Sequence, residues 1–557
     1  MYLQKYFKEN RKLLGILFVI SGTVFTFLLT LNYAVYIDYN GFTANDYEVQ
    51  PVYAAAAAII MLLVYIFLYK KKNFAEKTIG TVSSGVFGMS AVLSIFMFLQ
   101  LKNDTEKNLS HIIRALHGSE EVFAGSHIPN LVVWILCALA VWGLFILTVY
   151  TVNLILTWYL EFASQYSKEE KRYICITLFA GVSLICYFFS RTSGPWNSLD
   201  LVYQTDTIFV YDHYYPVFSY GFDFDWDIGN GGIRHPLATM ITYPIFILVS
   251  IVSNLLFWIP NIQAVLYAVI QLILLIFTAI MLGRMINSKW IYYLFTLSYP
   301  FILFTVLVEK YPLAVFLIVL YIYTTVFERS KKVSRYALIA ASGMMVTSAL
   351  LGVLYGSGKT IKKRLLEYNE AIMLFLITLI GTGRIHYIFD FYRLLHQNSV
   401  MFYEEPVAQW GLLNKFLGFL NLCASSLLPV AYEGTELNFY WIHLTDRVNY
   451  FGLAVLLIVL FACIKYVKVR YVLPFIIWFL FSVIQFVGTG FGTGCEPLFS
   501  LYFSWAIVPL LILGVNGIIR SAKVRNVLYC VLLIVMFYKN YIHCQDLLAY
   551  LIWKAPL

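Results

Sequence analysis

Charged residues are scarce in this chain, and the cysteine and histidine patterns of metal proteins are missing. Only 12% of its 557 residues are Asp, Glu, Lys or Arg, about half the share typical of soluble domains. The eight cysteines form no Cys-x-x-Cys pair, and the nine histidines show no metal-ligand spacing. These absences argue against a soluble domain, a disulfide framework and a zinc knuckle.

Nucleotide-binding motifs are also missing. Residues Gly356–Thr360 suggest a phosphate-binding loop, but Val353 stands where the Walker pattern needs a glycine. The glycine-rich segment Gly488–Pro497 has no Rossmann context around it. The net charge of +9 comes from basic residues that cluster in short loops between apolar runs, as in the cytoplasmic loops of membrane proteins. We therefore expect no soluble nucleotide site and no nucleic-acid partner.

Long apolar runs dominate what is present. Hydrophobic residues make up 61% of the chain and the mean hydropathy is +0.76. Runs of about 20 apolar residues recur, each long enough to cross a bilayer. The pattern predicts an all-α polytopic membrane protein with roughly 13–15 membrane segments. Lys5, Lys8, Arg11 and Lys12 precede the first run, so we expect a cytoplasmic N-terminus. Short loops without a large soluble domain favour a multi-pass protein of a bacterial plasma membrane.

Three regions follow one another along the chain. Residues 1–170 hold four apolar runs, residues 171–355 form a core with a polar loop at 191–236, and residues 356–557 form a C-terminal membrane region. Alternation of the basic loops places the polar loop outside. The same alternation leaves Leu237–Ile259 with both ends outside. We therefore expect a pair of short juxtamembrane or re-entrant helices there, and the alternative is one misassigned span.

The polar loop is the segment whose side chains best suit catalysis. It holds six of the 30 acidic residues of the chain and closes on Arg234, His235 and Pro236. Sugar transfer from a lipid phosphate needs a general base near the acceptor and cations near the departing phosphate. Asp206 and Asp212 are the candidate bases, and the Arg-His pair supplies the candidate cations. The alternative is a solvated loop whose acids only keep it out of the lipid.

A second acidic pattern in this loop, formed by Asp223, Asp225 and Asp227, resembles the start of a calcium loop. An EF-hand needs glycine at its sixth position and glutamate at its twelfth, where this chain has Ile228 and Arg234. We reject an EF-hand and expect no cofactor. The remaining alternatives are a looser divalent-metal site and a plain turn.

One charged pair, Glu309 and Lys310, stands between two apolar runs. The pair falls on the same predicted external side as the polar loop. Paired charges at such depth are costly and often functional. We predict a role in binding the substrate or its phosphate. The alternative is an interfacial ion pair in a tight helical hairpin ended by Pro312.

The order of these features resembles the GT-C superfamily of integral-membrane glycosyltransferases, nearest to its protein mannosyltransferase and aminoarabinose-transferase-like branch. In that family a helix ends in a long external loop bearing an Asp, and a His-Pro motif opens the next helix. Asp206 and Asp212 stand here in the Asp position, and residues 235–236 in the His-Pro position. Glu309 falls where the family carries a later external acid. Two features depart from the family: Leu237 follows the motif where a second proline is common, and four apolar runs precede the core.

The resemblance implies a polyprenyl-phosphate-linked sugar as donor and an envelope glycan, glycolipid or protein as acceptor. The reaction would be a single inverting displacement on the external face of the membrane. By the same likeness, Asp206 would be the base, with Asp212 as its substitute. Arg234, His235 and Lys310 would steady the lipid phosphate.

Three other interpretations stay open. A polytopic transporter or flippase would carry inverted repeats, and none is visible in the sequence. A polysaccharide polymerase or ligase of envelope glycolipids would favour Arg-rich external loops, whereas this loop is Asp-rich. A catalytically inactive scaffold that binds glycolipids is the third alternative, and only activity separates it from an enzyme.

Overall fold

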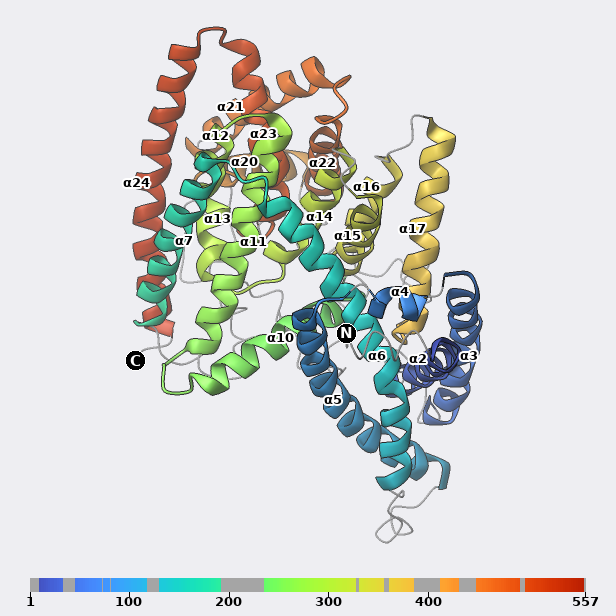
Figure 1. Ribbon diagram of the computed structural model, residues 1–557. Helices are drawn as coiled ribbons and strands as arrows, with labels where there is room; N and C mark the ends of the chain where they lie inside the picture. The colour runs from blue at the N-terminus through green and yellow to red at the C-terminus, as the bar shows by residue number, and fades with distance from the viewer. Residues whose placement is uncertain are drawn as a thin grey trace. The chain divides into compact units, whose positions relative to one another are not determined.

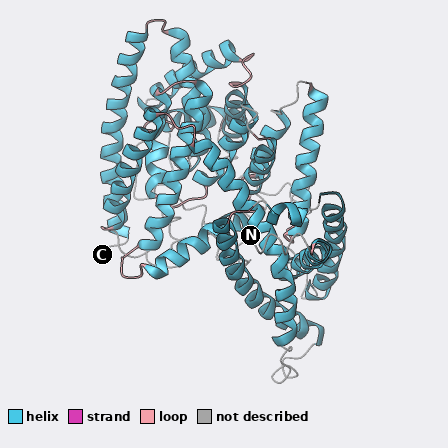
Figure 2. Ribbon diagram, viewed as in Figure 1, coloured by secondary structure: helices cyan, strands magenta, loops and turns pink. Residues whose placement is uncertain are grey.

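The computed structural model describes residues 10–33, 46–72, 74–80, 82–117, 130–191, 235–326, 330–354, 360–384, 411–429, 447–490 and 496–554. Within these ranges the chain consists of helices joined by turns and loops, without a strand (Figures 1 and 2). Nine of the helices so described are long and apolar enough to cross a membrane, and four shorter ones are also apolar. The chain is therefore a multi-pass helical membrane protein, as its hydropathy predicts.

The helices fall into two compact units. Unit 1 comprises Met1–Tyr166, Phe218–Leu248 and Ile372–Arg393, and unit 2 comprises Ser167–Val217, Val249–Ala371 and Leu394–Leu557. The helices wholly within unit 1 are α2 (Arg11–Tyr33), α3 (Asp46–Phe67), η2 (Leu68–Lys72), α4 (Phe74–Gly80), α5 (Ser84–His117) and α6 (Asn130–Ala163). Two helices, α10 (Ala238–Leu255) and α17 (Ile361–Gly381), belong partly to each unit.

Unit 2 holds the remaining helices. They are α7 (Lys168–Phe189), α11 (Ile262–Ile286), α12 (Trp290–Thr296), α13 (Tyr299–Val306), α14 (Tyr311–Val326), α15 (Lys331–Met344), η6 (Val346–Ser348), α16 (Ala349–Leu354), α20 (Leu412–Ser425), α21 (Arg447–Tyr466), α22 (Leu473–Val483), η7 (Ile484–Thr489), α23 (Glu496–Ile518) and α24 (Ala522–Lys554).

The segment after the polar loop differs from the expectation of two short helices. It forms one continuous helix, α10, of 18 residues. Pro244 lies inside this helix without ending it, although proline removes one backbone hydrogen bond. In a membrane, neighbouring groups can satisfy the freed carbonyl, so a proline in the sequence is no reliable end point for a helix there.

Unit 1 is packed through small residues on α2. A Cβ atom added to Gly22 would come within 2.7 Å of the Tyr65 ring, and one added to Gly15 would overlap the Tyr69 ring. On another side, a Cβ at Gly143 of α6 would lie 2.9 Å from the Gly22 backbone nitrogen. Small residues let membrane helices approach closely and gain van der Waals contact where burial from water gives no drive. The glycines therefore fix the α2–α3 and α2–α6 contacts.

Unit 2 is built around an antiparallel pair, α7 and α11, joined at three points (Figure 1). Glu170 near the start of α7 binds Arg284 near the end of α11. At the other end, the Asn261 side chain donates a 2.7 Å hydrogen bond to the Phe189 carbonyl. Between them, a Cβ added to Gly181 would lie 2.4 Å from a methyl carbon of the Leu272 side chain. The C-terminal end of α7, which precedes the polar loop in the sequence, therefore lies beside the start of α11.

Candidate functional site

The Glu309–Lys310 pair lies at the turn of a helical hairpin that packs along α11. Tyr292 in the first arm packs against Gly283 near the end of α11, and the turn contacts Gln271 further back along the same helix. The second arm, α14, then runs parallel to α11, and Tyr323 near its end lies within 3.5 Å of Arg284 Nη1. The hairpin suggested by the sequence is therefore present, with the charged pair at its turn.

The turn is held by the side chain of one buried residue, Gln271, which is fully buried. Its Nε2 atom donates to the carbonyls of Phe304 and Leu307, at 2.9 and 2.8 Å. Its Oε1 atom accepts the backbone N–H of Glu309 at 2.7 Å. The Glu309 carboxylate in turn accepts the backbone N–H of Lys310 at 3.2 Å. A helix end in an apolar setting must satisfy its free backbone groups, and Gln271 does so for three of them.

Both charged side chains of the turn are buried, with 2% of Glu309 and 4% of Lys310 exposed. Thirteen residues of α11 separate Gln271 from Arg284, which is about 20 Å at the helical rise of 1.5 Å per residue. The 16 residues of α14 span about 24 Å, less than the roughly 30 Å of a hydrocarbon core.

The His-Pro motif, His235 and Pro236, lies in unit 1. Arg234, which precedes the motif, lies outside the described residues. His235 is 8% exposed, and the carbonyl of Pro236 accepts a 3.0 Å hydrogen bond from Arg384 Nη1. Arg384 has no exposed surface. Its backbone N–H binds the Leu379 carbonyl at 2.7 Å, after Gly383 has turned the chain with a φ of +76°. This left-handed turn at the end of α17 places a buried cation against the motif.

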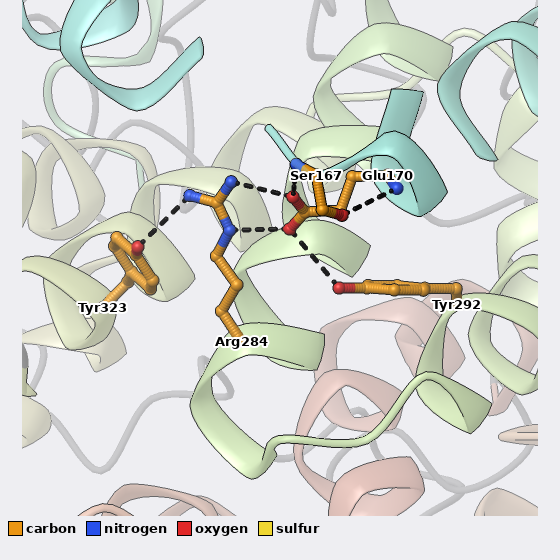
Figure 3. A network of polar contacts seen from close by, with 5 residues as sticks. All are labelled: Ser167, Glu170, Arg284, Tyr292 and Tyr323. Atoms are coloured by element: carbon orange, nitrogen blue, oxygen red, sulfur yellow. Dashed lines mark hydrogen bonds and ion pairs between the residues drawn. The ribbon is translucent and has the colours of Figure 1, made fainter. Parts of the chain in front are cut away.

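A third polar cluster, shown in Figure 3, forms at the α7 N-terminus of unit 2. Arg284 Nε and Nη2 donate to the two Glu170 oxygens at 2.7 and 3.1 Å. The same carboxylate accepts the backbone N–H of Ser167 at 2.7 Å, completing a capping box. Tyr292 approaches it from the other side at 3.4 Å. The cluster joins α7, α11 and α12 through a two-point ion pair, the stronger kind of charged contact.

Sequence reasoning missed Gln271, Arg284, Glu170 and Arg384. Glu170 carries a readable signal, because Ser167 and Glu170 have the spacing of a capping box. Gln271 and Arg384 carry a weaker one, a polar residue in or beside an apolar run. No local signal identifies their partners, since Gln271 and Glu309 are 38 residues apart and Arg384 and Pro236 are 148 apart.

The other predicted site residues lie outside the described residues. They are Asp206, Asp212, Arg234 and the three acids Asp223, Asp225 and Asp227. Their roles as bases, phosphate ligand or metal ligands stay predictions. Of the predicted set, the structure brings Glu309 and Lys310 together in unit 2 and places His235 in unit 1.

Fold and site together define a class, a polytopic helical membrane protein with two charged residues buried at the turn of a helical hairpin. Comparison with known proteins goes no further: the chain matches no protein-family model, no curated protein and no solved structure.

Proposed function

We propose that this protein is a membrane glycosyltransferase of GT-C type, which moves a sugar from a polyprenyl-phosphate donor to an envelope acceptor on the external face. The observation that carries the proposal is the buried Glu309–Lys310 pair at a hairpin turn. An ionisable pair within a membrane is expensive and marks a functional site by default. A lipid-linked substrate would present its polar head at this kind of depth.

The position of the pair relative to the polar loop supports the same proposal. The turn contacts the N-terminal half of α11 through Gln271, and α7 ends beside the first residue of that half, Asn261. The loop that carries Asp206 and Asp212 begins just after the end of α7. In this proposal, a base on the loop and a cation at the turn act on the same substrate.

The proposed chemistry is a single displacement with inversion. The acceptor oxygen attacks the anomeric carbon, and its proton passes to the carboxylate of Asp206, with Asp212 as the alternative base. The bond from the anomeric carbon to the phosphate oxygen breaks, and its electron pair leaves with the lipid phosphate. Lys310 would stabilise that developing charge, and Glu309 would orient the lysine. A role of Arg234 and His235 at the phosphate follows from the resemblance to the GT-C family alone.

Transfer of radiolabelled sugar from a panel of purified polyprenyl-phosphate donors in membranes tests the proposal. Asp206→Asn, Asp212→Asn, Glu309→Gln and Lys310→Met are compared with wild type at equal expression. Loss of turnover by about 100-fold in one Asp variant is expected for a lost general base. Glu169→Gln is the matched control, because Glu169 is an exposed acid paired with Lys289 at the far end of α11. No turnover by wild type with any donor would overturn the proposal.

A transporter or flippase is the second candidate, and one observation favours it. Discontinuous membrane helices also form the substrate sites of transporters, and the first arm of this hairpin is divided at Leu297–Ser298 into α12 and α13. Labelled glycolipid reconstituted in vesicles distinguishes the two: movement between leaflets without covalent transfer would support the flippase.

A further inference from the structure

Besides the Glu309–Lys310 turn, a second interruption lies in unit 2, between α15 and α16. The structure ends α15 at Met344, and Met345 is extended, with φ −146° and ψ 103°. A single 3-10 turn, η6, precedes the short helix α16. Backbone that leaves the helix within a membrane is tolerated where protein buries it or where it lines a polar site.

This interruption meets the Glu309–Lys310 turn at Tyr502 of α23. The Tyr502 hydroxyl lies 2.6 Å from the Thr347 hydroxyl, within η6. The Tyr502 ring also lies 6.1 Å from the ring of Tyr311, the residue that follows Lys310. Near the connection of α14 to α15, Thr325 and Ser334 are in contact at 2.6 Å, so the two helices run antiparallel. The Glu309–Lys310 turn before α14 and the break after α15 therefore lie at the same end of the α14–α15 hairpin.

Two buried polar groups near Tyr502 find no hydrogen-bond partner among the residues that the structure describes. One is the hydroxyl of Ser348, which follows Thr347 and has no exposed surface. The other is the indole N–H of Trp505, one turn along α23 from Tyr502. The Trp505 ring lies 5.6 Å from that of Trp478, whose own N–H binds the Tyr502 carbonyl. Native proteins rarely leave such groups unsatisfied, and each exception calls for an explanation.

The chemistry of the cluster points to a neutral ligand. Apart from Glu309 and Lys310, none of the side chains named in this cluster carries a charge. The other polar groups are hydroxyls and an indole N–H, which donate or accept single hydrogen bonds. Around them stand the rings of Tyr311, Phe499 and Trp478. Aromatic walls with a few placed polar groups are typical of small-molecule sites, and a carbohydrate combines hydroxyls with apolar C–H faces.

We propose that the two helix interruptions, together with Tyr502, form a binding site for the glycosyl headgroup of a lipid-linked substrate. Ser348, Thr347 and Tyr502 bind sugar hydroxyls, and the aromatic rings pack on the sugar. This assignment rests on the proposed function for the lipid linkage. It adds a sugar subsite next to Lys310, the cation that the proposed function places at the phosphate.

Equilibrium binding to the full-length protein in lipid nanodiscs tests the assignment. The probes are polyprenyl monophosphates bearing glucose, galactose or mannose, and bare polyprenyl monophosphate. Tryptophan emission gives the signal, since the Trp478 and Tyr502 rings are 5.0 Å apart. The variant Trp478→Phe identifies the part of the signal that comes from this site.

Ser348→Ala and Tyr502→Phe should each weaken binding of at least one glycosylated probe about tenfold, the equivalent of roughly one hydrogen bond. Binding of the bare phosphate should be unchanged. Both replacements remove a single oxygen, which limits their effect on folding. Thr324→Val is the control, because Thr324 bonds only to carbonyls of its own helix in the contacts that the structure records.

Three outcomes overturn the assignment: no glycosylated probe binds, the two variants bind as wild type does, or they weaken the bare phosphate equally. The last result would indicate a phosphate site instead. Sugar-dependent binding without transfer of the sugar in the membrane assay would refute the glycosyltransferase and leave the subsite standing. Transfer that survives in both variants with unchanged KM would refute the sugar subsite and leave the glycosyltransferase proposal standing.

Discussion

Two polar contacts on the same helix, α11, are built in different ways. At its end, Arg284 forms a two-point ion pair with Glu170, and the two side chains are 15% and 6% exposed. About 20 Å away, Gln271 uses a neutral amide to hold the backbone of the Leu307–Lys310 turn. The ion pair joins side chains of separate helices, whereas the amide shapes a loop that itself carries two buried charges.

The two contacts differ in what explains them. Folding stability accounts for the ion pair, whereas the charges at the turn need a further explanation. Glu170 caps α7 and ties it to α11 and α12, so stability alone explains why it is there. The turn needs Gln271 for the same reason. In the function proposed above the charge of Lys310 serves a ligand, and the following changes test that difference.

Breaking the ion pair should have the largest effect on stability. Arg284→Met leaves Glu170 as a buried charge without its cation, and the free energy of unfolding should fall by about 3–5 kcal/mol. Thermal unfolding in detergent measures the loss. The double variant Glu170→Gln with Arg284→Met should recover much of it, because no uncompensated charge is then left. A loss below about 1 kcal/mol would mean that the pair behaves as a solvated surface pair.

Removing the amide should cost less stability and more function. Gln271→Leu leaves two carbonyls and the Glu309 N–H without their partner, for a loss of about 2–3 kcal/mol if the turn relaxes partly. Sugar transfer per folded molecule should fall with Gln271→Leu and stay near wild type with Arg284→Met. Equal transfer by both variants would remove the distinction between the two contacts.

The next largest effect on stability is expected where α7 packs closely against α11. Gly181→Ala places a Cβ within 2.4 Å of the Leu272 side chain, and the strain should lower stability by about 1–3 kcal/mol. Leucine can shift, which favours the lower part of that range. Gly88→Ala on α5 is the control, since a Cβ there meets no atom within 4 Å, and it should be neutral or slightly stabilising. Equal effects at both sites would mean that α7 and α11 are not tightly packed.

The smallest effect is expected for Asn261→Gly, at the N-cap of α11. Asn261 has a φ of 59° and binds the Phe189 carbonyl. Asn261→Gly keeps the left-handed backbone but loses the hydrogen bond, at about 1 kcal/mol. Asn261→Ala loses both and should cost about 1–2 kcal/mol more. Chemical unfolding of the two variants side by side separates the contributions, and identical midpoints would contradict the role of the backbone angle.

The sequence predicts the long helices and the hairpin, and it predicts their interruptions poorly. Apolar length locates α7 and α11, and the charged pair before Pro312 marks the turn. Met345, by contrast, breaks a helix without proline or adjacent charge, because Tyr502 and Thr347 meet there only after folding. The run Trp290–Val308 likewise divides at Leu297–Ser298 into α12 and α13, where the Leu297 carbonyl accepts a hydrogen bond from Asn540. Long-range partners of this kind leave no local trace.

The link between Arg384 and Pro236 has a consequence for how the protein is made. The two residues are 148 positions apart, and ribosomes add about 5–20 residues per second. The His-Pro motif is therefore synthesised about 7–30 seconds before the arginine that binds it. Gly383, beside that arginine, then packs against Thr30 of the first helix. The contacts of the His-Pro motif are thus completed late in biosynthesis, when the residues that follow α17 meet α2.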